Sequence, residues 1–561
     1  MGKRNKKARN SAPHAQATPQ ITPPQTKPPS PPLASSPTDD NFNSQKEIKV
    51  ADPTVSCDTC APQVSQKLWQ RFYEPIVLLS AYGKSQGVHF KSTDDEEGWS
   101  DGNRDPKKQF LDQLAYICDY ETGGDTVTAV AVEHGPELKY WIAGNTNKEV
   151  KLRQYITGIL ASLETVFDAS EEHILAVQAQ ITDRVIELCS NRLEFYKRRL
   201  HPAAKWCIKQ LQREDTEAAN SLKIWLTSLC NRSLELRTLS QLCYDARALG
   251  RLSAITRKVE ETKQRRNSSD GGHYSEARHL IGRLGSHIKA VKVLVEVGRH
   301  YPQLFQNVSV QFATADQKFT APPYRSKTSI NEIINRMVSS NEPVLREFYQ
   351  KEIGHLDKTF GLELQKRIDE TYKDPKFRLR VHAEIILHDL FARENLQFLD
   401  GARYIGVSKP SCFLCYRYLQ AHRIRVQTSG CSNNLYLQWQ PPYVYDESLL
   451  GEQEAVLIKM NQEIRKFVLD TIVPNYQGHR SHPDSTTGIE TLVSVRHARS
   501  ESRFHGLPTQ TMPLETLTNS DVSLKRSFDS ESSDAVGENP SHLKREKYVD
   551  SSDESGVSLF A

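Results

Sequence analysis

Four side chains in a short stretch of this chain have the chemical types that a catalytic metal site uses. His382, Glu384, Cys412 and Cys415 all lie in VHAEIILHDLFARENLQFLDGARYIGVSKPSCFLC, residues 381–415. Imidazole nitrogen and thiolate sulfur bind zinc in proteins, and a catalytic zinc site takes three protein ligands and leaves the fourth position for water. His382, Cys412 and Cys415 would provide three such ligands, so the pattern predicts a Zn²⁺ site of the catalytic kind.

The elements expected in this stretch place these side chains at helix starts. Apolar spacing predicts a helix at 382–395, a buried strand at 402–408, a second helix at 411–422 and another strand at 424–428. Thiols three residues apart at a helix start face the same side, and the helix N-terminus stabilises their thiolates. A carboxylate two residues after the histidine is placed to carry protons and not to bind the metal. The alternation of helix and strand predicts an α/β fold.

The same residues have two other interpretations. One is a core histidine beside two buried cysteines, without a metal. The other is a structural zinc site, which needs a fourth protein ligand, and Cys431 and His388 are the candidates for it. The occurrence of the two motifs together argues against both of these interpretations. The chain has one H-x-E and, apart from Cys57 and Cys60, one C-x-x-C, and the two lie in the same short stretch. Together, as HAE…KPSCFLC, they resemble the H-x-E…P-C-x-x-C pattern of zinc deaminases.

Composition sets wide bounds on partners and location. The 561 residues carry a formal net charge of +4, which neither requires nor excludes a polyanionic partner. No apolar run approaches the length of a membrane span, and the first residues, MGKRNKKARN, lack the apolar core of a secretory signal. We therefore expect an intracellular protein, in the cytoplasm or nucleus, without a membrane partner. The basic start is either a solvated tail or a patch for nuclear import or a polyanion.

The chain divides by composition and periodicity into five parts. Residues 1–66 and 480–561 are rich in proline or serine and poor in large apolar residues, which predicts disordered tails. TVTAVAVEHGPELKYWIAGN predicts a β-hairpin within 67–150, the first part of an α/β domain. Its second part is 375–475, and 151–374 is predicted as an all-helical insertion packed beside the mouth of the site. Such an insertion is tolerable because loop-closure cost grows only logarithmically with length. The alternative is a separate helical domain, with the hairpin in some other sheet.

HAE, the KPSC-x-x-C turn and the earlier KYWIAGN resemble the cytidine-deaminase-like superfamily, and within it the fungal OTT-type group of nucleic-acid and nucleotide deaminases. The resemblance covers residues 70–150 and 375–475. It implies an α/β/α sandwich with a mixed sheet and with the metal ligands at the N-termini of two helices. It also implies hydrolytic deamination of a base, in which zinc hydroxide attacks, Glu384 shuttles protons and ammonia leaves.

Two further residues follow from the resemblance. Asn145 matches an asparagine that contacts substrate in many members, although a turn residue at this position explains it equally well. In the wider superfamily a proline directly precedes the first cysteine, whereas here Ser411 stands between Pro410 and Cys412. This departure leaves the ligands intact and puts the local turn in doubt.

The substrate and the activity itself have rival interpretations. Aromatic and basic residues follow the cysteines, as a single-stranded nucleic acid would need for stacking and phosphate contact, but core tyrosines and a solvated helix face explain them equally well. These residues are Tyr416, Arg417, Tyr418, Arg423 and Arg425. Free nucleotide, RNA and DNA all stay open as substrates. One rival is a catalytically inactive scaffold with a deaminase fold, and another is a basic-tailed nucleic-acid binder without chemistry; the intact Glu384 favours the enzyme.

Overall fold

The computed structural model describes residues 64–83, 90–91, 105–147, 149–264, 271–315 and 328–472 of the chain. The two predicted tails, apart from residues 64–66, and the pair Cys57 and Cys60 lie outside these ranges.

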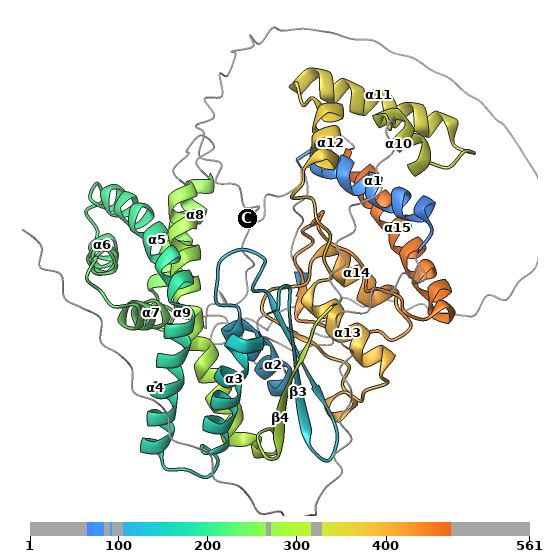
Figure 1. The fold of residues 1–561 in the computed structure, drawn as a ribbon. Coiled ribbons are helices and arrows are strands. Elements are labelled where there is room, and N and C mark those ends of the chain that lie inside the picture. The colour runs from blue at the N-terminus through green and yellow to red at the C-terminus, as the bar shows by residue number, and fades with distance from the viewer. Residues whose placement is uncertain are drawn as a thin grey trace, which may run out of the picture. The chain divides into compact units, whose positions relative to one another are not determined.

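The described ranges contain long runs of helices with short strands between them (Figure 1). The strands are β1 (Phe90–Lys91), β2 (Thr128–Glu133), β3 (Leu138–Gly144), β4 (Val308–Ala313), β5 (Gly406–Val407) and β6 (Gly430–Cys431). The α-helices are α1 (Gln66–Ala81), α2 (Pro106–Cys118), α3 (Glu149–Glu164), α4 (Glu171–Leu188), α5 (Ser190–Leu211), α6 (Glu217–Leu229), α7 (Leu236–Asp245), α8 (Arg251–Gln264), α9 (Gly271–His300), α10 (Ile330–Met337), α11 (Pro343–Phe360), α12 (Leu364–Lys373), α13 (Ala383–Arg393), α14 (Phe413–Ala421) and α15 (Leu450–Ile472). None of the helices in these ranges combines the length and the apolar character that crossing a membrane requires.

A mixed sheet joins the two parts of the chain that carry the predicted site. Its strand order is β4-β3-β2-β5, and β2 and β3 form the antiparallel hairpin that the sequence predicts. β5, from the stretch ARYIGVS, pairs antiparallel with the other edge of β2 through Ala129↔Val407 and Val130↔Gly406. The predicted strand IRVQT forms a single parallel bridge, Tyr404↔Gln427, instead of a full strand. The hairpin therefore shares its sheet with the stretch between the metal motifs.

One strand lies where the sequence analysis predicts helices alone. β4 pairs parallel with β3 from Leu138↔Val308 to Ala143↔Ala313 and forms the edge of the sheet. The prediction of an all-helical insertion is wrong at this point. Val308, Val310 and Phe312 alternate with polar residues, which is the period of a strand, but the run is short and follows long helical stripes. A parallel neighbour also needs a crossover connection, and here α3–α9 provide it.

The two faces of the sheet are buried in different hydrophobic clusters, because successive strand residues point to opposite faces. Val130 and Val132 of β2 belong to a cluster with α2 and α3–α9. We call the helices α3–α9 the helical lobe. Ala129 and Ala131 belong to a second cluster with α1 and α10–α15. The segment 151–374 thus contributes helices to both clusters, and the change from one to the other falls at β4.

Candidate metal centre

The three predicted ligands sit at the starts of two helices. His382 directly precedes α13 and Cys412 directly precedes α14, while Cys415 lies in the first turn of α14. The first amide groups of a helix have no partner within it, so each start needs an acceptor from elsewhere. At α14 the Cys412 sulfur accepts from the Cys415 amide at 3.4 Å. At α13 the side-chain oxygen of Asn145 accepts from the Ala383 amide at 2.9 Å.

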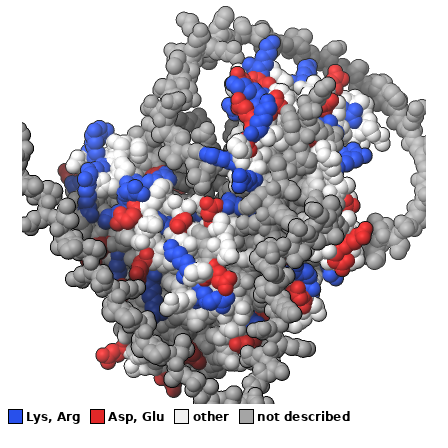
Figure 2. Space-filling model, viewed as in Figure 1, with Lys and Arg blue, Asp and Glu red and all other residues white. Residues whose placement is uncertain are grey.

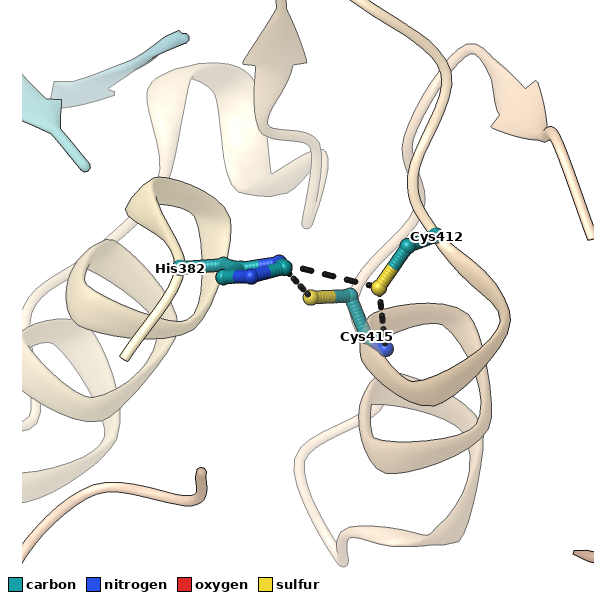
Figure 3. A group of neighbouring side chains, drawn as sticks. All are labelled: His382, Cys412 and Cys415. Carbon is teal, nitrogen blue, oxygen red and sulfur yellow. Dashed lines mark hydrogen bonds between the residues drawn. The ribbon is translucent and has the colours of Figure 1, made fainter. Parts of the chain in front are cut away.

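The structure brings the three side chains together (Figure 3). His382 Nδ1 lies 3.6 Å from Cys412 Sγ and 3.3 Å from Cys415 Sγ. All three ligand atoms lie within 4.8 Å of one another, and all three residues are buried. Tetrahedral bonds of about 2.0–2.1 Å to nitrogen and about 2.3 Å to sulfur separate the two atoms by roughly 3.5 Å. The donor set therefore fits a zinc ion in both chemical type and spacing.

The protonation of the two thiols differs within the pair. Burial raises the pKa of both, but at Cys412 the contacts with Cys415 and with the His382 imidazole outweigh burial, so its pKa lies well below the usual value. The pKa of Cys415 stays well above it, because burial and the neighbouring Cys412 sulfur both disfavour a second negative charge. A dication that binds both sulfurs would favour the second thiolate, so metal binding would release a proton here.

Glu384 is buried beside the ligands without belonging to them. It lies in the first turn of α13, is 4% exposed, and its carboxyl contacts the Cys415 thiol. Burial raises the pKa of Glu384, with His382 opposing the shift. A carboxyl with a raised pKa takes up a proton more readily than an exposed one and can return it. This position and this environment suit a proton shuttle.

Comparison with known families agrees with this geometry. Residues 381–443 match the family described as OTT_1508_deam-like deaminase. This segment is similar to a deaminase-family domain. It begins one residue before His382 and includes both cysteines and Glu384. No curated protein and no solved structure matches the chain. The predicted resemblance to a deaminase family is confirmed, and the fungal source stays a prediction.

The two candidates for a fourth protein ligand lie outside the ligand group of the deaminase domain. His388 Nε2 bonds to the backbone oxygen of Ile424 at 2.8 Å, and burial lowers the pKa of His388 to about 3. The Cys431 sulfur accepts from the Asn433 amide at 3.3 Å, and burial raises the pKa of Cys431 to about 12. Among the described residues the group consists of one histidine and two cysteines, the ligand number of catalytic zinc and not of structural zinc.

Asn145 and Ser411 both hold backbone segments at the centre. The Asn145 side chain bridges the Ala383 amide and the backbone oxygen of Gly124, to which it donates at 2.8 Å, so both ends of the amide are engaged. Ser411 is the residue that departs from the superfamily pattern. Its backbone amide donates to the backbone oxygen of Gly430, and its backbone oxygen accepts from the Ser432 amide. The inserted serine thus fastens the turn before the first cysteine to a neighbouring segment.

Most of the aromatic and basic residues that follow the cysteines, in α14 and just after it, have partners within the fold. Tyr418 is 2% exposed, and its hydroxyl donates to Gln453 at 3.1 Å. Arg417 and Arg423 pair with Glu463 and Glu452 of α15 at 2.7 and 2.8 Å. On the face drawn in Figure 2, basic and acidic side chains lie interspersed. These contacts favour the interpretation as core and solvated face over a phosphate-binding surface at Tyr418, Arg417 and Arg423.

Tyr436 lies beside the centre, and no sequence pattern predicted it there. Its ring centroid is 6.3 Å from that of His382, in an edge-to-face arrangement, and the residue is 45% exposed. It belongs to a stretch without regular structure, NNLYLQW, where no periodicity singles it out. An exposed aromatic ring next to a candidate metal ligand offers a stacking surface for a planar ring.

Proposed function

We propose that this chain is a zinc-dependent hydrolytic deaminase that acts on a nucleobase in a nucleotide or a single-stranded nucleic acid. The observation that carries the proposal is the place of Glu384, a buried carboxyl beside Cys415 and outside the ligand group. Burying a carboxyl is costly, and this one has no ligand role to offset the cost. A proton shuttle explains it, whereas an inactive scaffold does not.

The sheet supports the corresponding fold. β2, β3 and β5, with helices on both faces, fit a cytidine-deaminase-like α/β/α sandwich split between 67–150 and 375–475. The helical lobe is inserted between the hairpin and α13 in the chain, and its helices cover one face of the sheet. The insertion in this proposal includes β4 and is not purely helical.

His382, Cys412 and Cys415 would hold the zinc ion. When bound, the metal would supply Lewis-acid activation of the attacking water. Glu384 takes one proton of that water and delivers it to the ring nitrogen; it then carries the remaining proton from the newly attached hydroxyl to the amino group, which leaves as ammonia. The carbon–nitrogen bond to the amino group breaks, and a carbon–oxygen bond replaces it. Tyr436 provides the ring against which the base stacks.

The first test combines metal analysis with ammonia release on nucleosides, nucleotides and single-stranded oligonucleotides. We expect about one zinc per chain, lost in His382→Ala, Cys412→Ser and Cys415→Ser because each variant removes one of three ligands. Cys431→Ser is the matched control, since it removes a buried cysteine outside the ligand group. Undiminished zinc in all three ligand variants would refute the site. Neither metal nor ammonia from the wild type would favour the inactive scaffold.

A further inference from the structure

The loop from Asp119 to Val127, between α2 and β2, contacts the segment that precedes each ligand-bearing helix. On the histidine side, Arg380 Nη1 donates to Asp125 Oδ1 at 2.6 Å, two residues before His382. Asn145 connects the same loop to the first amide of α13. The loop is therefore attached to the segment 380–382 before α13, which we call the histidine arm; the segment 409–412 before α14 is the cysteine arm.

The cysteine arm is tied to the same loop through Lys409, which stands three residues before Cys412. Its ammonium donates to the backbone oxygen of Gly123 and lies 3.4 Å from Asp119 Oδ2. The lysine side chain is 21% exposed, whereas the carboxylate that it faces is fully buried. Lys409 thus fixes the start of the turn that leads into the Cys412 ligand.

Asp119 also meets the helical lobe. Arg192 of α5 is 1% exposed, its Nη1 lies 3.3 Å from Asp119 Oδ2, and it also donates to the backbone oxygen of Asp119. Thr126 donates to the other carboxylate oxygen at 2.6 Å. Burial raises the pKa of Asp119, but Lys409 and Arg192 together outweigh burial and leave the pKa below its usual value. One charged carboxylate therefore joins α5, the loop and the cysteine arm.

Buried ion networks contribute little to stability compared with apolar side chains of the same volume, because desolvation offsets the attraction. Their clearer effect is geometric, since a charge that is paired on two sides has few alternative positions. Groups that hold metal ligands in place typically change metal affinity about 10–100-fold when they are removed. The network around Asp119 has the connections that such a role requires.

We propose that Asp119 is a positioning residue of the metal centre, through which α5 of the helical lobe fixes the arm that carries Cys412 and Cys415. The inference rests on the zinc site of the proposed function. It gives the helical lobe a role in holding the centre, which is distinct from selecting substrate at its mouth.

The test measures metal retention and not turnover. Asp119→Asn removes the charge and keeps an acceptor for Thr126, and Lys409→Met cuts the link on the cysteine side while the Arg192–Asp119 pair remains. We expect both variants to release zinc to a chelator about 10–100-fold faster than the wild type. We also expect an altered absorption spectrum of the cobalt-substituted protein. Lys409→Arg, which keeps the charge, should restore slow release.

Glu74→Gln is the matched control. Glu74 of α1 is 4% exposed and pairs with Arg336 of α10 at 2.7 Å, so the variant removes a comparable buried charge from a pair that joins α1 to α10. It should lower thermal stability and leave zinc release and the cobalt spectrum unchanged.

Four outcomes would count against the proposals, and they are separable. Zinc release at the wild-type rate in Lys409→Met would overturn the positioning role, and this variant decides the matter even where Asp119→Asn fails to fold. Equally fast release from Glu74→Gln would also overturn it, since retention would then merely follow stability. A wild-type protein without metal would overturn the proposed function together with this inference. A metal-loaded wild type that releases no ammonia would overturn the activity alone.

Discussion

Glu384 follows His382 by two positions, and the start of α13 gives the two side chains different environments. The histidine nitrogen faces the two sulfurs, while the carboxyl lies buried against Cys415, and burial raises its pKa. Residue types and spacing were enough to predict that His382 meets the two cysteines, and the shuttle role of Glu384 stays a prediction. The spacing alone does not predict the contact of Glu384 with the Cys415 thiol, because that contact depends on how α13 packs against α14.

The substitution Glu384→Gln tests the shuttle. The amide has nearly the same size and cannot take up or return a proton, so we expect the zinc content and melting temperature of the wild type. We expect turnover to fall by about 10²–10⁴-fold, the usual contribution of a general acid–base group. Metal analysis, thermal melting and ammonia release on the same preparation measure the three quantities. Turnover at the wild-type rate would assign the proton transfer to another base.

The hairpin, α13 and α14 could be predicted because each has a local period that its packing preserves. Ser329 and Glu332 likewise form the capping box before α10 that their spacing indicates. β4 could not be separated from its helical surroundings, because its position depends on pairing with β3, far away in the chain. Tyr436 had no local pattern at all. What escaped prediction is thus mostly set by contacts between distant segments.

One such contact is the approach of α2 to β5. A Cβ atom at Gly406 would lie 2.6 Å from the backbone oxygen of Leu111 in α2, so only glycine fits there without displacing the helix. We expect Gly406→Ala to lower the free energy of unfolding by about 1–3 kcal/mol, as overpacking does. It should also weaken zinc retention, since β5 leads into the turn before Cys412. Urea unfolding and zinc release measure the two effects.

Gly354→Ala is the control for this substitution. Gly354 lies exposed within α11, and a Cβ atom there would have no neighbour within 4 Å. Alanine should stabilise that helix by about 0.5–1 kcal/mol. If the two variants unfold at the same urea concentration, then the close approach of α2 to β5 does not constrain the sheet.

The two hydrophobic clusters share one sheet, and this shapes how the chain should unfold. Each strand of the hairpin puts alternate side chains into each cluster, so losing either cluster uncovers one face of β2 and β3. The charged contacts around Asp119 add a second connection between the helical lobe and the metal centre. A lobe that only adjoined the deaminase domain would have neither connection. We therefore expect damage inside the lobe to reach the ligands.

Leu284→Ala in α9 tests that expectation far from the metal. Leu284 is fully buried in the lobe, and truncating such a leucine costs about 2–5 kcal/mol. Tryptophan fluorescence reports on the lobe through Trp206 and Trp225 and on the second cluster through Trp69 and Trp439, so a lobe that unfolds alone gives a separate step. The absorption of bound cobalt reports on the centre. Both signals should shift to lower urea together, because the shared sheet couples the clusters. Leu175→Ala is the matched control, since Leu175 of α4 is 55% exposed and should leave both transitions in place. A fluorescence transition that moves while the cobalt transition stays would show that the lobe unfolds independently of the metal centre.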